Sequence, residues 1–264
     1  MTDLRSHFEQ LRAGGQKLLV PYLMGGVPDR ATWPDAFAAV AASADAVEVG
    51  LPFSDPLMDG PVIAAAGERA IRAGNGPLEV LASMGGIPGG PPRVVMTYYN
   101  PIHRIGEGRF CDRAAASGFS GLIVPDLPHE ESTTLRAAAR KSGLAWIPLV
   151  APTTPPARIE KVVEEATGFV YAVSTMGVTG LRTSLSESAH RVVGACRDAT
   201  DAPVLIGIGV STPEQAVEAA TVADGVVIGS AVVRLLVDQG PEAAGHFLAR
   251  VRSALGADHS ANSN

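Results

Sequence analysis

The chain contains few cysteines, few aromatic residues and no long hydrophobic run. Its two cysteines, Cys111 and Cys196, lie in helix-like stretches without the paired spacing of a disulfide framework or a metal-binding knuckle. No apolar run approaches the ~18 residues of a membrane span, and the amino-terminal residues lack the basic-then-apolar order of a secretion signal. The sequence therefore predicts a cytoplasmic protein without disulfide bonds.

Charge and composition narrow the function further. Aromatic residues make up 5% of the chain and hydrophobic residues 46%, which allows a large aliphatic core. Lys and Arg number 21 against 27 Asp and Glu, so the formal net charge is -6. This balance argues against binding to nucleic acid or to anionic membranes as the main role, although backbone amides can still bind an anion locally.

Short apolar runs alternate with amphipathic stretches along the chain. Eight runs rich in Val, Ile and Leu are typical of buried parallel strands, namely Lys17–Leu23, Ala44–Val49, Arg93–Thr97, Gly121–Val124, Ala145–Leu149, Gly168–Ala172, Pro203–Ile206 and Gly225–Ile228. Helical patterns follow them, with extra helices at Leu4–Leu11 and Ser230–Asp238. This rhythm predicts an α/β fold, a single-domain (β/α)8 TIM barrel over residues 1–255, with residues 256–264 as a disordered polar tail. A doubly wound sheet is disfavoured because its early G-x-G-x-x-G is missing.

Two acidic residues near the second predicted strand are the first candidates for catalysis. Glu48 ends an apolar strand, where a carboxylate is costly to bury without a role. Asp59 lies on the loop Gly50–Pro61 that follows, and two acids so placed suggest acid–base chemistry. The alternatives are a structural carboxylate at Glu48 and a turn former at Asp59.

Other strand ends carry weaker candidates. Tyr98 could line an apolar pocket or cap the core, and for Asp126 and Tyr171 a satisfied polar residue of the core is favoured. The Gly/Thr-rich stretch Ser174–Thr183 could close over a ligand or form a plain loop. The histidines show no metal-binding spacing, so no metal site is expected, and His103 alone stays a weak ligand candidate.

Glycines after the last two strands favour phosphate binding over tight turns alone. Gly209 belongs to a G-I-G turn after the seventh strand, and Gly229 with Ser230 follows the eighth. Glycine lets backbone N–H groups approach an anion closely. These two loops, with the start of a short extra helix, form the usual phosphate site of a barrel.

Several motifs together resemble the tryptophan synthase α subunit family. The most specific is E-V-G-L-P-F-S-D-P-L-M-D-G-P, from Glu48 to Pro61. M-T-Y-Y-N-P, L-I-V-P-D-L-P, A-P-T-T, G-V-T-G and G-I-G-V-S follow in the family's order, so the match covers nearly the whole chain. The resemblance implies a carbon–carbon lyase of tryptophan biosynthesis, a TIM barrel that cleaves indole-3-glycerol phosphate to indole and glyceraldehyde 3-phosphate.

The resemblance also implies roles for individual residues. Glu48 is expected to be the general acid/base and Asp59 the second catalytic carboxylate. Thr179 is expected to bond Asp59 when its mobile loop closes. The substrate-binding positions comprise Tyr171 beside the acids, Tyr22 and Tyr98 in the indole pocket, and Gly180, Gly209, Gly229 and Ser230 around the phosphate.

A partner is implied as well. The family works with a β subunit that carries pyridoxal phosphate, in a complex of two α and two β chains, and this chain itself is expected to need no cofactor. Pro52, Asp55 and Pro56 match the loop that contacts β. Three departures from the family pattern, Val27, Ala64 and Thr175, remove no catalytic group. A stand-alone lyase, a non-catalytic activator of β and another phosphate-binding barrel such as indole-3-glycerol phosphate synthase are the rival interpretations.

Overall fold

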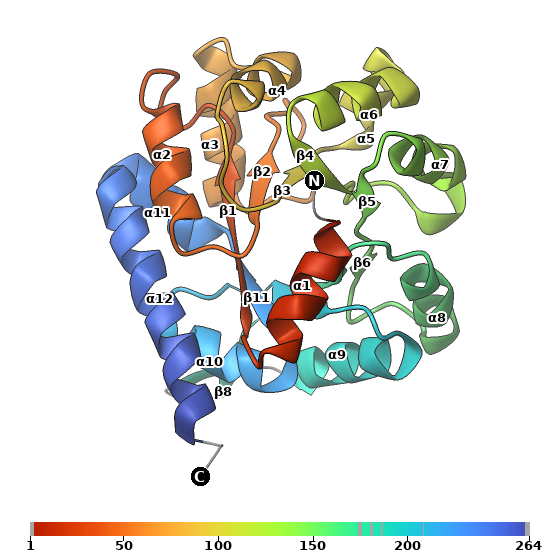
Figure 1. The fold of residues 1–264 in the computed structure, drawn as a ribbon, viewed down its shortest axis with the longest axis vertical. Coiled ribbons are helices and arrows are strands. Elements are labelled where there is room, and N and C mark those ends of the chain that lie inside the picture. Colours follow the sequence, from red (N-terminus) through yellow and green to blue (C-terminus); the bar gives the residue numbers. More distant parts are fainter. Residues whose placement is uncertain (1–2, 174–175, 180–181, 186, 208, 262–264) are drawn as a thin grey trace.

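Parallel strands form the centre of the fold and helices cover them on the outside (Figure 1). The computed structural model describes residues 3–173, 176–179, 182–185, 187–207 and 209–261. In these residues the sheet has the order β5 (Ala145–Trp146), β4 (Phe119–Ile123), β3 (Arg93–Met96), β2 (Val47–Gly50), β1 (Leu18–Met24), β11 (Gly225–Ile228), β10 (Val204–Gly207), β7 (Val170–Val173) and β6 (Leu149–Val150).

The two ends of this order are consecutive in the chain. The strand predicted at Ala145–Leu149 is divided because Pro148 has no N–H to give to a neighbouring strand. Around the break, Ile147 N donates to Leu122 O on one side at 3.1 Å, and Tyr171 N donates to Pro148 O on the other at 3.0 Å. The strands thus curl into a ring that closes through residues 145–150, and the predicted TIM barrel is confirmed.

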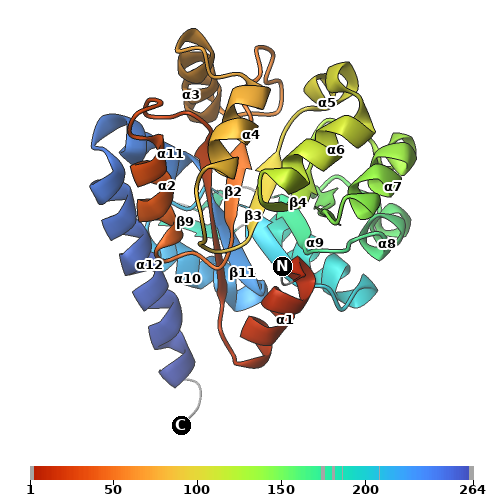
Figure 2. The same ribbon diagram turned by 45° about the horizontal axis from the view of Figure 1, so that its top comes forward.

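Helices surround the ring (Figure 2). They are α1 (Leu4–Ala13), α2 (Trp33–Ala41), α3 (Pro61–Arg72), α4 (Pro77–Gly85), α5 (Tyr99–Ile105), α6 (Glu107–Ala116), α7 (Thr133–Lys141), α8 (Pro156–Glu164), α9 (Glu187–Ala199), α10 (Pro213–Val222), α11 (Ser230–Asp238) and α12 (Pro241–Ala261), with a 3₁₀ turn, η1 (His129–Glu131).

Several helices differ from the prediction. Helices α4 and α5 were not predicted. Helix α12 runs to Ala261, six residues beyond the predicted end of the barrel at residue 255 and into the stretch predicted to be a disordered tail. Gly256 disfavours the helix by only about 1 kcal/mol, and no proline follows to stop it. Residues 262–264 lie outside the described residues.

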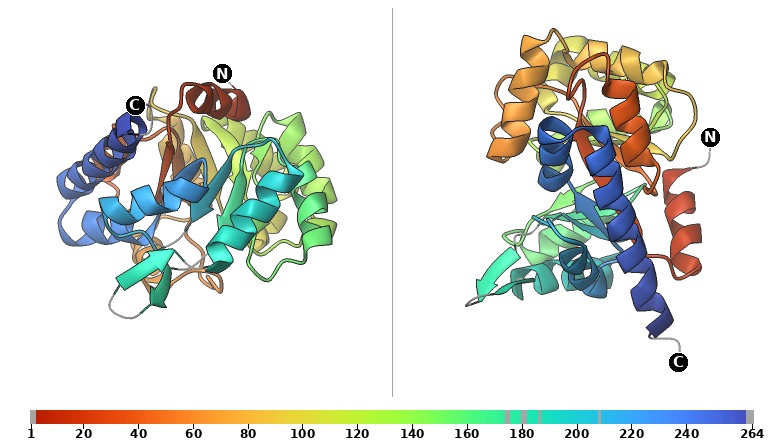
Figure 3. Two further views of the ribbon diagram at one scale, coloured as in Figure 1. Left: turned by 90° about the horizontal axis from the view of Figure 1, so that it is seen from below. Right: turned by 90° about the vertical axis from the view of Figure 1, so that its left-hand side faces the viewer.

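The segment after β7 contains a hairpin. Strands β8 (Met176–Thr179) and β9 (Arg182–Leu185) pair antiparallel, and β9 lies against α10. Figure 3 shows the hairpin projecting from the body of the barrel. Ser174, Thr175, Gly180, Leu181 and Ser186 lie outside the described residues.

The barrel interior is closed at its amino-terminal end by α1. Leu4 and Phe8 of this helix pack on inward-facing residues such as Leu18, Val20 and Phe169. A separate, larger cluster of buried residues lies between the strands and the outer helices. Because side chains alternate along a strand, each strand supplies both layers.

Buried carboxylates tie the amino-terminal ends of the strands together. Asp45 is 8% exposed and accepts hydrogen bonds from Leu19 N at 2.7 Å and Gln16 Nε2 at 2.6 Å. It also forms an ion pair with Arg252 of α12. One carboxylate therefore joins β1, the approach to β2 and the last helix.

Replacing this carboxylate tests its contribution. Asp45→Ala leaves Leu19 N without its acceptor and Arg252 without its ion-pair partner, so the free energy of unfolding should fall by about 3 kcal/mol. Glu68→Ala is the matched control, since Glu68 forms an ion pair with Arg72 while 63% exposed, and it should change stability by less than about 0.5 kcal/mol. Urea denaturation measures both, and equal losses would contradict the role given to Asp45.

Candidate active site

The alternation of β2 sets Glu48 inside the barrel. Val47 and Val49 pack in the outer core, while Ala46 belongs to the interior cluster. Glu48 therefore points inward, beside Tyr22, its register partner on β1. It lies near the carboxyl end of its strand, the end where barrel active sites form.

The carboxyl of Glu48 is held in its neutral form by burial. Glu48 is 1% exposed, and its Oε2 atom has no hydrogen-bond partner among the described residues. Loss of hydration, followed by the nearby charge of Asp59, raises the pKa of Glu48 to about 8. At neutral pH this side chain is therefore an acid that still holds a proton.

Asp59 faces the same space from the loop after β2 and ionises more easily. Burial raises its pKa, but hydrogen bonding with the Tyr98 hydroxyl lowers it and partly offsets that effect. The same hydroxyl accepts from Met58 N at 3.0 Å. The two acids thus have different environments, which is how one site obtains both a proton donor and a carboxylate.

A cavity of about 210 Å³ unites most of the predicted site. Both acids, the residues around them and the glycine turns line this cavity. The lining residues are Tyr22, Glu48, Asp59, Ile63, Met96, Tyr171, Gly207, Gly209, Val210, Val227, Gly229 and Ser230. The apolar members Ile63, Met96, Val210 and Val227 were not predicted. Strand alternation could have indicated Met96 and Val227, which face inward.

Some predicted site residues lie elsewhere. Tyr98 does not line the cavity but supports the loop that carries Asp59. Thr179 belongs to β8, and Gly180 is outside the described residues. His103 is exposed on α5, where its ring contacts Tyr99.

The predicted partner loop is partly exposed. Pro52 is buried, Pro56 is half-buried and Asp55 is exposed. Leu57 and Met58, which follow, are 83% and 63% exposed and rank among the large hydrophobic side chains that the described chain leaves in solvent. The loop therefore presents apolar surface directly beside Asp59.

Two tyrosines flank Glu48, each lying over a glycine of the next strand. A side chain at Gly50 would overlap the Tyr22 hydroxyl, and one at Gly207 would overlap that of Tyr171. Burial raises the pKa of both tyrosines well above the usual value, so both remain protonated. Gly50 was read only as part of a loop motif, and the contact that requires glycine there is visible only in three dimensions.

The glycine turns that line the same cavity suit an anion. Gly229 precedes α11 and gives it no side-chain cap, so the first N–H groups of this helix face outward at its positive end. Gly209 borders open space, since an added Cβ there would meet no atom within 4 Å. Both glycines and Ser230 line the cavity that holds Glu48, so an anion bound by them would share that cavity with the acids.

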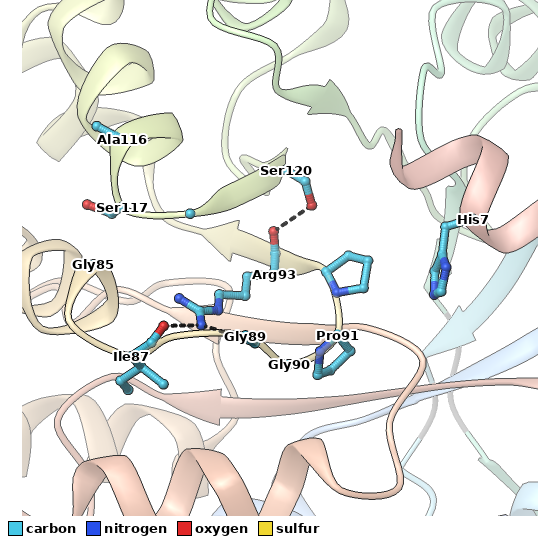
Figure 4. Close-up of a pocket in the computed structure, with 12 residues that line it drawn as sticks. His7, Gly85, Ile87, Gly89, Gly90, Pro91, Arg93, Ala116, Ser117 and Ser120 are labelled. Atoms are coloured by element: carbon cyan, nitrogen blue, oxygen red, sulfur yellow. Dashed lines mark hydrogen bonds between the residues drawn. The ribbon is translucent and has the colours of Figure 1, made fainter. Parts of the chain in front are cut away.

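A larger cavity, of about 510 Å³, lies at the amino-terminal end of the barrel (Figure 4). Its central side chain, Arg93, donates to the carbonyls of Met84, Ile87 and Gly89 at 2.5–2.8 Å and stacks on Phe37. These bonds fasten the end of α4 to β3. No acidic residue lines this cavity, so the smaller cavity is the better candidate for acid–base chemistry.

Among the described residues, no group of three or more His, Cys, Asp or Glu side chains is arranged to hold a metal ion. No helix in the described part of the chain is long and apolar enough to cross a membrane.

Comparisons with known proteins agree on one family. A family model described as Tryptophan synthase alpha chain matches residues 8–257. The tryptophan synthase alpha chain of Carboxydothermus hydrogenoformans is 46% identical over 239 residues, covering 89% of this chain and 90% of the relative. That of Streptomyces avermitilis is 45% identical over 251 residues, covering 93% and 89%.

Solved structures give the same result. The chain is similar to tryptophan synthase from M. tuberculosis, in an aminoacrylate- and BRD0059-bound form, with a TM-score of 0.86 at 37% identity over 96% of this chain and 97% of that chain. It is also similar to tryptophan synthase subunit alpha from Legionella pneumophila str. Paris, with a TM-score of 0.87 at 30% identity over 97% and 99%.

The neutral state of Glu48 has a consequence for stability. Between the usual pKa of 4.5 and the raised value of about 8, the unfolded chain gives up the Glu48 proton while the folded chain keeps it. This residue therefore makes the fold progressively less stable as pH rises through that window. Gln cannot titrate. The free energy of unfolding of Glu48→Gln, relative to that of the wild type, should therefore be higher at pH 8 than at pH 5 by about 3 kcal/mol. Urea unfolding at both pH values measures this, and a difference independent of pH would contradict the raised pKa.

Proposed function

The chain belongs to the tryptophan synthase alpha chain family, and on that premise we propose that Glu48 and Asp59 carry out its reaction at the 210 Å³ cavity. The family's reaction is the lyase half-reaction of tryptophan biosynthesis, cleavage of indole-3-glycerol phosphate to indole and glyceraldehyde 3-phosphate. The observation that carries the residue assignment is that the buried Glu48 lines one cavity together with Asp59 and the glycine turns.

The reaction is a retro-aldol cleavage that needs two proton movements. C3 of the indole must gain a proton so that the ring becomes a leaving group, and the hydroxyl beside the breaking bond must lose one. Glu48 gives its proton to C3 and, as the carboxylate so formed, accepts the hydroxyl proton as the carbon–carbon bond breaks. Glu48 is thereby restored, and the products are indole and the aldehyde. A pKa near 8 suits a group that must act as acid and base in turn.

Asp59 has a complementary role. Positive charge develops on the indole ring when C3 is protonated. An ionised carboxylate at Asp59 accepts a hydrogen bond from the indole N–H and stabilises that charge. Burial raises the pKa of Asp59, and the hydrogen bond with Tyr98 lowers it. Asp59 therefore ionises more easily than Glu48.

The substrate phosphate binds at the glycine-lined end. The N–H groups at the start of α11 and the open backbone at Gly209 would hold it, so that binding energy positions the substrate without touching the breaking bond. Tyr22 and Tyr171 then flank the reacting carbons as neutral walls. No cofactor is required in this chain for such a reaction.

The family works with a β subunit, and a complex of two α and two β chains is the arrangement proposed for this chain. Pro52, Asp55 and Pro56 would contact β, and the exposure of Leu57 and Met58 on the same loop supports this choice. Pyridoxal phosphate belongs to the β subunit in this proposal. Because the loop also carries Asp59, β binding would act directly on the site.

Removing the acid tests the catalytic role. Glu48→Gln keeps the shape of the side chain but cannot give or take a proton, so kcat for indole release should fall by about 10²- to 10⁴-fold with KM little changed. In the wild type, kcat/KM should decline above about pH 8, where Glu48 loses the proton that starts the reaction. Near-normal turnover of the variant would refute the assignment.

A substitution at the proposed phosphate site tests substrate binding separately from catalysis. Gly209→Asp sets a negative charge beside the proposed phosphate position and should raise KM by about tenfold or more. Gly108→Asp adds the same charge to exposed α6, outside the cavity, and should leave KM close to the wild-type value. If the two variants behave alike, the phosphate lies elsewhere.

A mixing assay tests the partner. Indole release from indole-3-glycerol phosphate would be measured with this chain alone and with a tryptophan synthase β subunit. We expect stimulation in the range of about 5- to 150-fold that coupling between sites usually gives. Equal rates with and without β would instead indicate a stand-alone lyase.

A further inference from the structure

The loop that carries Asp59 depends on one side chain outside the catalytic cavity. The loop residues Leu57 and Met58 are exposed, so the loop gains little from packing there. Tyr98 contacts it three times. Its ring lies 5.2 Å from that of Phe53, its hydroxyl accepts from Met58 N at 3.0 Å, and the same hydroxyl interacts with the carboxyl of Asp59.

The position of Tyr98 in turn depends on the start of α5. Tyr98 is the N-cap residue of this short helix, with φ -70° and ψ 156°, but its side chain gives the helix no cap. Instead, the carboxylate of Asp126, which follows β4, accepts from Tyr99 N at 2.8 Å. A carboxylate at this point satisfies a free N–H and complements the positive end of the helix. It therefore fixes the peptide that joins Tyr98 to Tyr99.

We propose that Asp126 is a positioning residue of the active site, acting on Asp59 through Tyr98. The chain of contacts runs from the Asp126 carboxylate to Tyr99 N, through the Tyr98 backbone to its hydroxyl, and from there to Met58 and Asp59. The proposal rests on the proposed function, since it gives Asp59 a catalytic task. Asp126 does not line the catalytic cavity, so its effect must be indirect.

The geometry predicts that the loss of Asp126 lowers the reaction rate and leaves substrate affinity unchanged. A shift of about 1 Å in a catalytic group can cost on the order of 10²-fold in rate. Without Asp126 the start of α5 loosens, the Tyr98 hydroxyl moves, and Asp59 loses the contact that both orients it and lowers its pKa. The phosphate end of the cavity is built by β10, β11 and α11 and should keep its affinity.

Two substitutions at Asp126 separate capping from charge. Asp126→Ala removes the acceptor and should lower kcat for indole release about tenfold with little change in KM. Asp126→Asn keeps an oxygen of equal capping ability and should restore most of the rate. Both are assayed in the chain alone, so that contacts of the exposed Asp126 with a partner subunit play no part.

The route through Tyr98 is tested by a double variant. Tyr98→Phe removes the hydroxyl that reaches Met58 and Asp59, so adding Asp126→Ala to it should lower kcat by less than twofold further. Asp3→Ala is the control for a purely structural loss. Asp3 caps α1 through a bond to Ser6 N at 3.1 Å at the opposite end of the barrel, and its removal should lower the unfolding midpoint without lowering kcat.

The outcomes are distinct. A tenfold loss in Asp126→Ala, rescue by Asn and no further loss in the Tyr98→Phe background support the proposal. A normal rate in Asp126→Ala, or losses that multiply in the double variant, would overturn it while the lyase assignment stands. A wild-type chain that releases no indole, alone or with β, would refute the proposed function itself.

Discussion

The architecture of the site depends on the burial of one carboxyl group. Glu48 is enclosed by the barrel, and its Oε2 has no hydrogen-bond partner among the described residues. This environment is unfavourable to the charged form and therefore keeps a proton where the reaction needs one. Stability is reduced to create this acid, and the surrounding fold must compensate. The buried carboxylates at the other end of the strands, such as Asp45, belong to that compensation.

Two different kinds of support hold the two acids. Glu48 sits on a strand, where its direction is set by the alternation of β2 and by neighbours in register. Asp59 sits on an exposed loop whose order comes from Tyr98 and, through α5, from Asp126. The strand sets the direction of the first acid, while the second lies on a loop that a β subunit would contact in the proposed complex. This division suits an enzyme whose family works with a second subunit.

Much of this organisation is visible in the sequence, and the rest requires long-range contacts. Apolar strands at regular spacing predicted the barrel, and Glu48 at a strand end predicted a carboxylate at its mouth. The interruption at Pro148 divides the fifth predicted strand into β5 and β6 but leaves the order of strands around the ring unchanged. Helix α5 was not predicted because Pro101 and two tyrosines disfavour it locally, while its cap, Asp126, comes from another strand. Tyr98 was read as a pocket residue because the loop it supports is 40 residues away, and Gly50 gave no signal of its contact with Tyr22.

The most direct test is to titrate the Glu48 carboxyl itself. The side-chain carboxyl carbons of ¹³C-labelled glutamates can be followed by NMR as pH changes, and the signal absent from Glu48→Gln identifies this residue. We expect a titration midpoint near 8 in the folded, ligand-free chain. A midpoint near 4.5, the ordinary value, would show that burial does not hold the proton on Glu48.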